Sequence, residues 1–218
     1  MSISESIPKQ CSIVVLISGS GSNLQALIDH AEHGGYAIRA VISNKADAYG
    51  LTRAAEANIP TSVLSHREFL SREAFDTELA TLIDQFEPDL VVLAGFMRIL
   101  SASFVNHYAG RLINIHPSLL PKFPGTNTHQ RALDEGEELH GASVHFVTEE
   151  LDGGPVIARR SVSIEAGDSA ESLAAKVLEQ EHQLYPMVVS WFANGELRMA
   201  DGRAIHSSKT LPDTVHAG

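Results

Sequence analysis

Two side chains suited to chemistry, Asn114 and His116, lie two residues apart at the end of an apolar run that begins at Leu112. The run is typical of a β-strand, in which this spacing places both side chains on one face. Pro117 follows at once and cannot extend a central ladder, so we expect the strand to end at His116. An amide and an imidazole would then lie at the carboxyl end of a strand, where α/β sheets carry their sites. The simpler alternative is a histidine that only hydrogen-bonds at a strand end.

A glycine-rich loop at residues 19–23 follows a run typical of a strand and precedes a helical pattern. Glycine lets the backbone approach an anion closely, and the first amides of a helix are free to bind phosphate. Ser22 and Gln25 have the spacing of a reciprocal helix cap, which predicts that the helix begins at this loop. We therefore expect Gly21, Ser22 and Asn23 to bind a phosphate group.

Two other interpretations of this loop are weaker. A tight strand-to-helix turn can occur without any ligand. A Rossmann dinucleotide site needs a third glycine, where this chain has Leu24, and an acidic residue after the second strand, where it has Ser43 and Asn44. The pattern thus favours a phosphate monoester over a pyrophosphate.

The elements that position these residues alternate regularly along the first half of the chain. We predict strands at Ser12–Ile17, Ala37–Ser43, Thr61–Leu64, Asp89–Gly95 and Leu112–His116, and helices at Asn23–Glu32, Tyr49–Ala57 and Ser71–Gln85. Such alternation is typical of an α/β fold with a mainly parallel, Rossmann-like twisted sheet and helices on both faces. The run from Leu90 to Ala94 is apolar on both alternating faces, so we expect an inner strand there.

The pattern changes after His116, where closely spaced prolines predict a loop. We then expect a helix near Asn127–Glu135, strands at Ala142–Thr148 and Val156–Ile164 that form an antiparallel addition, and a helix from Asp168 to about His182. Asp168 and Glu171 resemble a capping box that opens this last helix, which puts Glu181 on its final turn. From Asp201 onward the chain is polar and weakly patterned, and we expect a poorly ordered tail.

Composition excludes several classes of protein. The chain has 218 residues, 44% of them hydrophobic, and carries 16 basic and 27 acidic side chains for a net charge of −11. This balance disfavours a nucleic-acid partner, which needs a basic face. The single cysteine, Cys11, allows no intrachain disulfide and no thiolate metal cluster. The polar first ten residues and the short longest apolar stretch, Leu90–Met97, predict a cytoplasmic protein without a membrane partner.

The Asn-x-His-Pro-Ser segment at residues 114–118 resembles the signature of the folate-dependent formyltransferases. A second block of that family is found in the expected order at residues 147–155. Agreement extends to residues 17–25, 43–47, 93–100 and 180–182, so the resemblance covers almost the whole chain. Within the superfamily the chain is most similar to the glycinamide ribonucleotide formyltransferases. The resemblance implies formyl transfer from 10-formyltetrahydrofolate to the amine of 5′-phosphoribosylglycinamide in de novo purine biosynthesis, with no metal.

Formyl transfer between nitrogens requires a neutral amine, stabilisation of an oxyanion and a route for a proton. Asn114 and a protonated His116 can donate hydrogen bonds to the oxyanion. Asp152 can orient His116, favour its charged form and assist proton transfer. Taken alone, Asp152 ahead of two glycines would be read as a turn residue, and the matching block is what assigns it to the site.

The resemblance also implies the binding residues. The loop with Gly21, Ser22 and Asn23 would hold the ribonucleotide phosphate, and Glu181 would bind the sugar. The folate would contact an apolar pocket, a loop that closes over the pterin and an arginine for its glutamate tail: Leu93, Met97, Arg98, Ile99, Leu100 and Val105, then Thr148, Glu149, Glu150 and Leu151, and Arg72. Without the resemblance, the apolar members of this set would be assigned to the core.

We expect one domain over residues 1–218, with a phosphate-binding half at about 11–110, a catalytic and folate-binding half at about 111–200, and a polar tail at 201–218. A monomer or a weak homodimer is expected. The family implies a cis peptide bond before Pro121. Asn127 stands where relatives often carry a second histidine, so contacts made by that histidine are in doubt. His145 is interpreted as mostly structural.

Three alternatives stay open at this point. A formyltetrahydrofolate hydrolase would use the same Asn114, His116 and Asp152 with water as acceptor, although such enzymes carry an additional regulatory domain. A methionyl-tRNA formyltransferase is disfavoured by the acidic charge and the short chain. A catalytically silent nucleotide-binding module is disfavoured by the intact catalytic residues.

Overall fold

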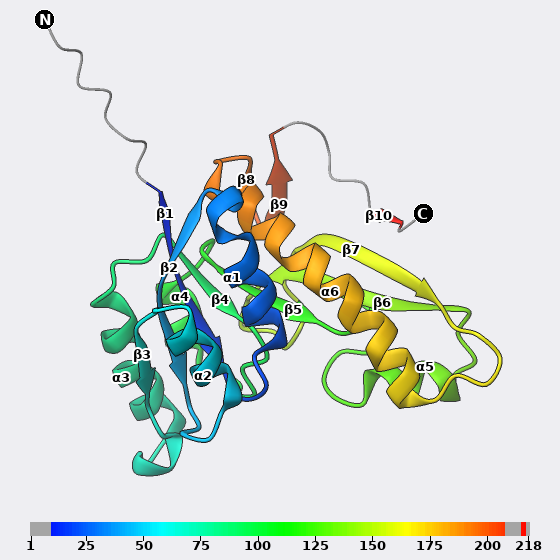
Figure 1. Cartoon of the computed structure of the whole chain (residues 1–218), viewed down its shortest axis with the longest axis horizontal. Coiled ribbons are helices and arrows are strands. Elements are labelled where there is room, and N and C mark those ends of the chain that lie inside the picture. The colour runs from blue at the N-terminus through cyan, green and yellow to red at the C-terminus, as the bar shows by residue number, and fades with distance from the viewer. Residues whose placement is uncertain (1–9, 208–214, 217–218) are drawn as a thin grey trace, which may run out of the picture.

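The computed structural model describes residues 10–207 and 215–216. Its main feature is an eight-stranded sheet in the order β10-β7-β6-β5-β4-β1-β2-β3 (Figure 1). The strands are β1 (Cys11–Ile17), β2 (Tyr36–Ser43), β3 (Thr61–Val63), β4 (Leu90–Leu93), β5 (Leu112–His116), β6 (Leu139–Phe146), β7 (Val156–Ser163) and β10 (Val215–His216). A separate hairpin joins β8 (Leu197–Ala200) to β9 (Arg203–His206).

Strands β1 to β5 are mutually parallel, whereas β6 pairs antiparallel with β5 and β7 pairs antiparallel with β6. The predicted mainly parallel sheet with an antiparallel addition is therefore confirmed. β4 lies between β1 and β5, so the inner position expected for its apolar run is confirmed as well. The carboxyl ends of β1, β4 and β5 meet at one edge of the sheet, because the three strands are parallel and adjacent.

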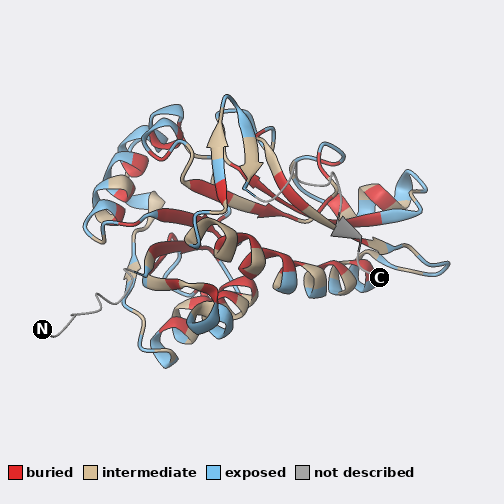
Figure 2. Ribbon diagram, turned by 90° about the horizontal axis from the view of Figure 1, so that it is seen from above, coloured by how far each residue is buried: buried red, intermediate tan, exposed pale blue. Residues whose placement is uncertain are grey.

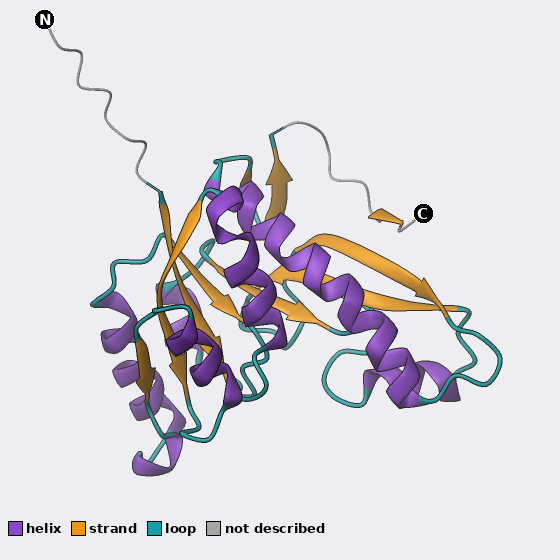
Figure 3. Cartoon of the chain, viewed as in Figure 1, coloured by secondary structure: helices purple, strands orange, loops and turns teal. Residues whose placement is uncertain are grey.

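Helices cover both faces of the sheet (Figure 3). They are α1 (Ser22–Gly34), α2 (Tyr49–Glu56), α3 (Arg72–Asp84), α4 (Ala102–His107), α5 (Thr128–Asp134) and α6 (Ala170–Ala193), with a short 3-10 helix η1 (His66–Glu68). β1 shows why two layers form: Ile13, Val15 and Ile17 pack with α1 and α6 on one face, while Val14 and Leu16 pack with α3 and α4 on the other. The sheet is accordingly buried along its centre (Figure 2).

Helix α6 links the sheet to the first half of the chain. It lies beside α1 across the sheet (Figure 1). The hydroxyl of its buried Tyr185 donates to the carbonyl oxygens of Leu93 and Ile113, at 2.8 and 3.2 Å. These two bonds connect α6 to β4 and β5 close to where those strands approach the site.

The predicted bounds of α6 are wrong at both ends. Its cap is the reciprocal pair Ser169 and Ser172 rather than Asp168 and Glu171, and Asp168 instead accepts from Ser172 Oγ at 2.8 Å. The helix also continues to Ala193 instead of ending near His182. Pro186 lies inside it, and the buried stripe on either side of that proline offsets the lost backbone bond.

Other departures follow from short or weakly patterned segments. Helix α4 was not predicted, and β4 and β6 end earlier than expected, at Leu93 and Phe146. The expected tail is wrong for residues 201–207, because β9 pairs with β8 there. Residues 208–214 and 217–218 lie outside the described part of the chain. No helix in the described residues is both long and apolar enough to cross a membrane.

Candidate active site

Strand β5 presents Asn114 and His116 on the same face, as their spacing predicts. The intervening Ile115 and the preceding Ile113 point the other way, into the core beneath α6. Asn114 is paired in register with His145 of β6, and His116 with Ser143. The strand ends at His116, ahead of Pro117, as expected.

His116 is held by both of its ring nitrogens. Its Nε2 lies 2.8 Å from the backbone oxygen of Phe123, an atom that can only accept, so Nε2 carries a proton. Its Nδ1 lies 3.5 Å from Asp152 Oδ2. Because Nε2 is engaged by the backbone, Nδ1, on the side of Asp152, is the ring nitrogen that can face a substrate. The side chains of His116 and Asp152 are both nearly buried.

Asp152 comes from the loop between β6 and β7. Its backbone is in the left-handed region at φ 51°, and its Oδ2 accepts from the backbone amide of Gly125 at 2.8 Å. Its other oxygen, Oδ1, lies 3.7 Å from Nε2 of His145. The amide of Gly125, in the loop after β5, thus holds the carboxylate between the two histidines.

The loop after β5 contributes Phe123 and Gly125 to this arrangement. The Leu120–Pro121 peptide bond is cis, as the family resemblance implied. Asn127 is in the left-handed region at φ 57° and forms the N-cap of α5, with no hydrogen bond from its side chain to the helix.

The glycine loop places its residues at the amino end of α1, although the predicted side-chain cap is wrong. Gly21 is the N-cap, with φ 70°, and no side chain caps the helix. Gln25 is instead bonded to Asp29 and to Arg53. A β-carbon on Gly21 would lie 2.5 Å from the Cα of Gly50, so this position requires glycine for both its conformation and its packing.

Asn23 and Glu181 are brought together across 158 residues, with Asn23 Nδ2 donating to Glu181 Oε2 at 2.7 Å. Glu181 is buried in the middle of α6 rather than on a last turn, and burial raises the pKa of its carboxyl. Asn23 Oδ1 is also buried and has no partner. Two polar groups held this close, with an unused acceptor, suit a polar ligand.

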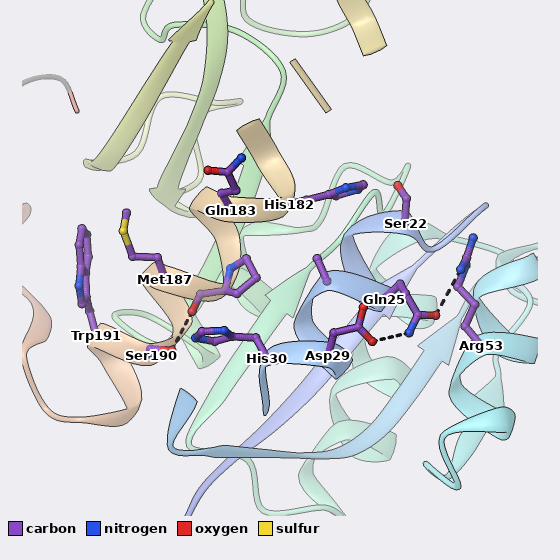
Figure 4. Close-up of a pocket in the computed structure, with 12 residues that line it drawn as sticks. Ser22, Gln25, Asp29, His30, Arg53, His182, Gln183, Met187, Ser190 and Trp191 are labelled. Carbon is purple, nitrogen blue, oxygen red and sulfur yellow. Dashed lines mark hydrogen bonds between the residues drawn. The ribbon is translucent and has the colours of Figure 1, made fainter. Parts of the chain in front are cut away.

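A hollow of about 730 Å³ begins beside this loop and runs between α1 and α6 (Figure 4). Ser22, Arg53 and His182 lie at its loop end (Figure 4). Arg53 Nε donates to the carbonyl of Ser20 at 2.9 Å, and Nε2 of His182 is buried without a partner. No local pattern marks Arg53 as a site residue, and His182 is marked only by its place in the matching block at residues 180–182.

The predicted folate residues fall into two groups. Leu93 and Val105 are buried in the core beside α3 and α4. Met97, Ile99 and Leu151 are large apolar side chains with 66%, 60% and 56% of their surface exposed. Exposed apolar side chains of this size, contributed by two separate loops, are typical of a ligand surface.

The remaining predicted folate residues have mixed surroundings, and Leu100 packs against the core beside α3 and α4. Arg98 is half-buried over the ring of Phe75 and Leu100 is half-buried, whereas Thr148 is half-buried and Glu150 exposed in the loop after β6. Glu149 accepts from Asn106 of α4 at 2.8 Å. Arg72 begins α3, where its Nε lies 3.5 Å from Glu73.

Two further histidines lie behind the site and were not predicted. His140 Nε2 is 3.1 Å from Nδ1 of His129, and the ring of His140 packs edge-on against Phe123. Burial lowers the pKa of His140 to about 4 and also lowers that of His129. These uncharged rings support the loop that holds His116. Among the described residues, no cluster of His, Cys, Asp or Glu side chains is arranged to hold a metal.

The chain is similar to known proteins along nearly its whole length. The family described as formyl transferase matches residues 11–189. The chain belongs to the formyl transferase family. It is 58% identical over 207 residues to phosphoribosylglycinamide formyltransferase of Escherichia coli (strain K12), covering 94% of this chain and 98% of the relative.

Other formyl transferase relatives are similar over the same region. The trifunctional purine biosynthetic protein adenosine-3 of Bos taurus is 46% identical over 200 residues, which cover 91% of this chain and 20% of that protein. The phosphoribosylglycinamide formyltransferase structure from Coxiella burnetii superposes with a TM-score of 0.90 at 52% identity, covering 94% of this chain and 97% of that chain. Family membership makes this chain a formyl-transferring enzyme.

Proposed function

We propose that this chain transfers the formyl group of 10-formyltetrahydrofolate to the amine of 5′-phosphoribosylglycinamide, producing formylglycinamide ribonucleotide and tetrahydrofolate. The observation that carries the proposal is the convergence of Asn114, His116 and Asp152 at the end of β5, in a formyl transferase chain closely similar to enzymes named for this reaction. Action on small molecules, without nucleic acid or membrane, and a monomer or weak homodimer in the cytoplasm complete the proposal.

The first step is attack of the neutral substrate amine on the formyl carbon. A carbon–nitrogen bond forms, the carbonyl π electrons move to oxygen, and the oxyanion accepts hydrogen bonds from Asn114 Nδ2 and from protonated His116 Nδ1. Nε2 of His116 is occupied by Phe123, so Nδ1 is the only ring nitrogen that can serve. Donors placed in a nearly buried site cost little reorganisation as the charge develops.

The second step moves one proton. The attacking nitrogen becomes cationic, and Asp152 accepts its proton, directly or through a water molecule. The tetrahedral carbon then collapses, its bond to N10 of the folate breaks, and N10 leaves with a proton returned from the site. The carboxylate of Asp152 is suited to this because Gly125 and His116 hold it in one orientation.

The ribonucleotide would bind at the amino end of α1. Its phosphate would accept from the backbone amides of Gly21, Ser22 and Asn23, and its sugar hydroxyls would donate to Glu181. Arg53 would supply positive charge beside the phosphate and His182 a ring N–H donor, since both line the hollow that opens at Ser22. Burial and the nearby Arg53 lower the pKa of His182, so the guanidinium is the group that offsets locally the net charge of −11.

The folate would lie against the exposed apolar residues of the β4 loop and the β6–β7 loop. Met97 is tied to the phosphate loop because its backbone amide donates to Ser18 Oγ at 2.8 Å. Ser18 in turn donates to Asn44 Oδ1 at 2.6 Å. Ser18, just after β1, and Asn44, just after β2, therefore connect the proposed folate surface to the phosphate loop.

The decisive experiment separates transfer from hydrolysis. The enzyme alone should leave 10-formyltetrahydrofolate intact, because water lacks the phosphate anchored at Ser22 and Asn23 that holds an acceptor in line. Adding 5′-phosphoribosylglycinamide should release tetrahydrofolate, with one formyl group on the ribonucleotide for each folate product by mass spectrometry. Rapid release of formate without the ribonucleotide would instead favour the hydrolase.

A further inference from the structure

His145 is a buried histidine of β6 that contacts two of the proposed catalytic groups at once. Its Nε2 lies 3.3 Å from Asn114 Nδ2 and 3.7 Å from Asp152 Oδ1. Only 2% of its surface is exposed. The sequence suggested a structural role, and the mechanism above does not use this ring.

The hydrogen-bond partners of His145 fix its tautomer. Its Nδ1 lies 2.9 Å from the carbonyl oxygen of Phe146. A carbonyl has no hydrogen to give, so Nδ1 must carry the proton and Nε2 of the neutral ring must be an acceptor. The atom of Asn114 that faces Nε2 is therefore its amide nitrogen, a donor.

We propose that neutral His145 is a positioning residue, which fixes the orientation of the Asn114 amide and thereby the oxyanion donor. This rests on the proposed function of Asn114. An isolated primary amide can rotate by half a turn at little cost, exchanging its oxygen and nitrogen. A single acceptor at Nε2 removes that freedom, since the flipped amide would place two acceptors against each other. One Nδ2 hydrogen then bonds to His145, and the second is left for the substrate.

Protonation of His145 would reverse this preference. Nε2–H would become a donor, would favour the oxygen of Asn114, and would attract Asp152 Oδ1, which draws the carboxylate toward His145 and its Oδ2 away from His116. The titratable groups that act on His145 are Asp152, from the loop after β6, and His116, from β5. Burial lowers the pKa of His145, which keeps the ring neutral at the pH where the amide must be aligned.

Two substitutions of similar size test the proposal. His145→Asn keeps a donor for the Phe146 carbonyl but has nothing at the Nε2 position. His145→Gln reaches that position with an amide oxygen and does not titrate. We expect His145→Asn to lower kcat by roughly 10- to 100-fold, because the oxyanion donor Asn114 would be misaligned. Both KM values should stay within about twofold of the wild type. His145→Gln should recover most of kcat at pH 7.5. In a plot of kcat against pH it should also lack the part of the decrease at acidic pH that protonation of His145 causes in the wild type.

Two further measurements isolate the mechanism. In an Asn114→Ala enzyme, the added His145→Asn change should cost less than about threefold, because the residue through which it acts is gone. Nitrogen-15 spectra of imidazole-labelled wild-type protein should show the neutral Nδ1–H tautomer of His145 at pH 7.5, independently of any activity.

Three outcomes would overturn the proposal. They are an imidazolium or Nε2–H form of His145 at pH 7.5, unchanged kcat in His145→Asn, and an equal loss in His145→Asn with and without Asn114. Absence of ribonucleotide formylation by the wild-type enzyme would refute the proposed function instead, and the spectra would still decide the tautomer.

Discussion

Each oxygen of the Asp152 carboxylate faces a different histidine, so this one side chain relates both rings to the reaction. His116 lies on the Oδ2 side and His145 on the Oδ1 side. The left-handed backbone of Asp152 is the cost of this placement, and it occurs next to two glycines.

Removing either partner of the His116–Asp152 pair should stop chemistry without preventing folate binding. We expect His116→Ala and Asp152→Ala each to lower kcat by roughly two to four orders of magnitude, the range for loss of an acid–base or oxyanion group. Folate affinity, measured by fluorescence titration, should stay within about threefold, because the proposed pterin contacts lie in other loops. Near-normal turnover in Asp152→Ala would remove this carboxylate from the mechanism.

A carboxylate in the phosphate loop should act on one substrate only. Asn23→Asp places a negative charge beside the ribonucleotide phosphate, so the KM for the ribonucleotide should rise at least about tenfold while that for folate stays constant. The new carboxylate would also face Glu181, which now accepts from Asn23 at 2.7 Å.

A companion variant separates these two effects. Glu181→Gln restores an uncharged partner for the substituted residue, so Asn23→Asp with Glu181→Gln should recover thermal stability. Ribonucleotide affinity should stay low, because the loop carboxylate remains and the sugar has lost its carboxylate acceptor; Glu181→Gln alone measures that second loss. An equal rise of both KM values in the single variant would mean that the loop has been misassigned.

At this scale the sequence predicted what depends on spacing along one strand and little that depends on distant contacts. Asn114 and His116 are two residues apart on β5, and their common face follows from that alone. His182 and Arg53 reach the phosphate loop from α6 and α2, and His145 reaches Asn114 from β6. Nothing local marks such residues.

At the scale of elements, the turn from β1 into α1 requires glycine at position 21 but not at position 19. Gly21→Ala should destabilise the protein by roughly 2–4 kcal/mol, because φ is positive there and the new methyl would meet Gly50. Gly19→Ala is the matched control: its Cβ would have nothing within 4 Å, so the change should stay within about 0.5 kcal/mol. Urea unfolding measures both, and similar values would contradict the assigned packing.

The helices and strands were predicted well where the hydrophobic pattern extends over many residues. They were predicted poorly where tertiary packing determines whether a segment is helical. The six residues of α4 carry too short a pattern to distinguish them from a loop. Pro186 would normally end a helix, yet the core on both sides of it keeps α6 continuous. The Ser169–Ser172 cap lay one residue beyond the predicted pair, a displacement that sequence spacing alone cannot resolve.

At the scale of the whole molecule, buried neutral histidines should make stability depend on pH. The folded-state pKa of His140 is about 4, below its ordinary value of 6.5. The unfolded chain therefore binds more protons between these values, so stability is fully present above about pH 6.5 and falls as the pH approaches 4. We expect a loss on the order of 2 kcal/mol by pH 4.5 in urea unfolding.

His129 and His145 shift in the same direction and add to this slope. A His140→Gln variant, which cannot titrate, should show a shallower decline over the same range even if it is less stable at pH 7.5. A decline as steep as that of the wild type would assign the effect to other groups.

The contact between Asn23 and Glu181 also limits when, during synthesis of the chain on the ribosome, the ribonucleotide site can form. The two residues are 158 positions apart. At about 5–20 residues per second, a ribosome needs roughly 8–30 s to travel between them. For most of that interval a nascent chain has the phosphate loop but no part of α6, which begins at Ala170, and the apolar face of β1 that this helix covers is bare. Emerging chains should therefore be clients of chaperones before they can bind the ribonucleotide.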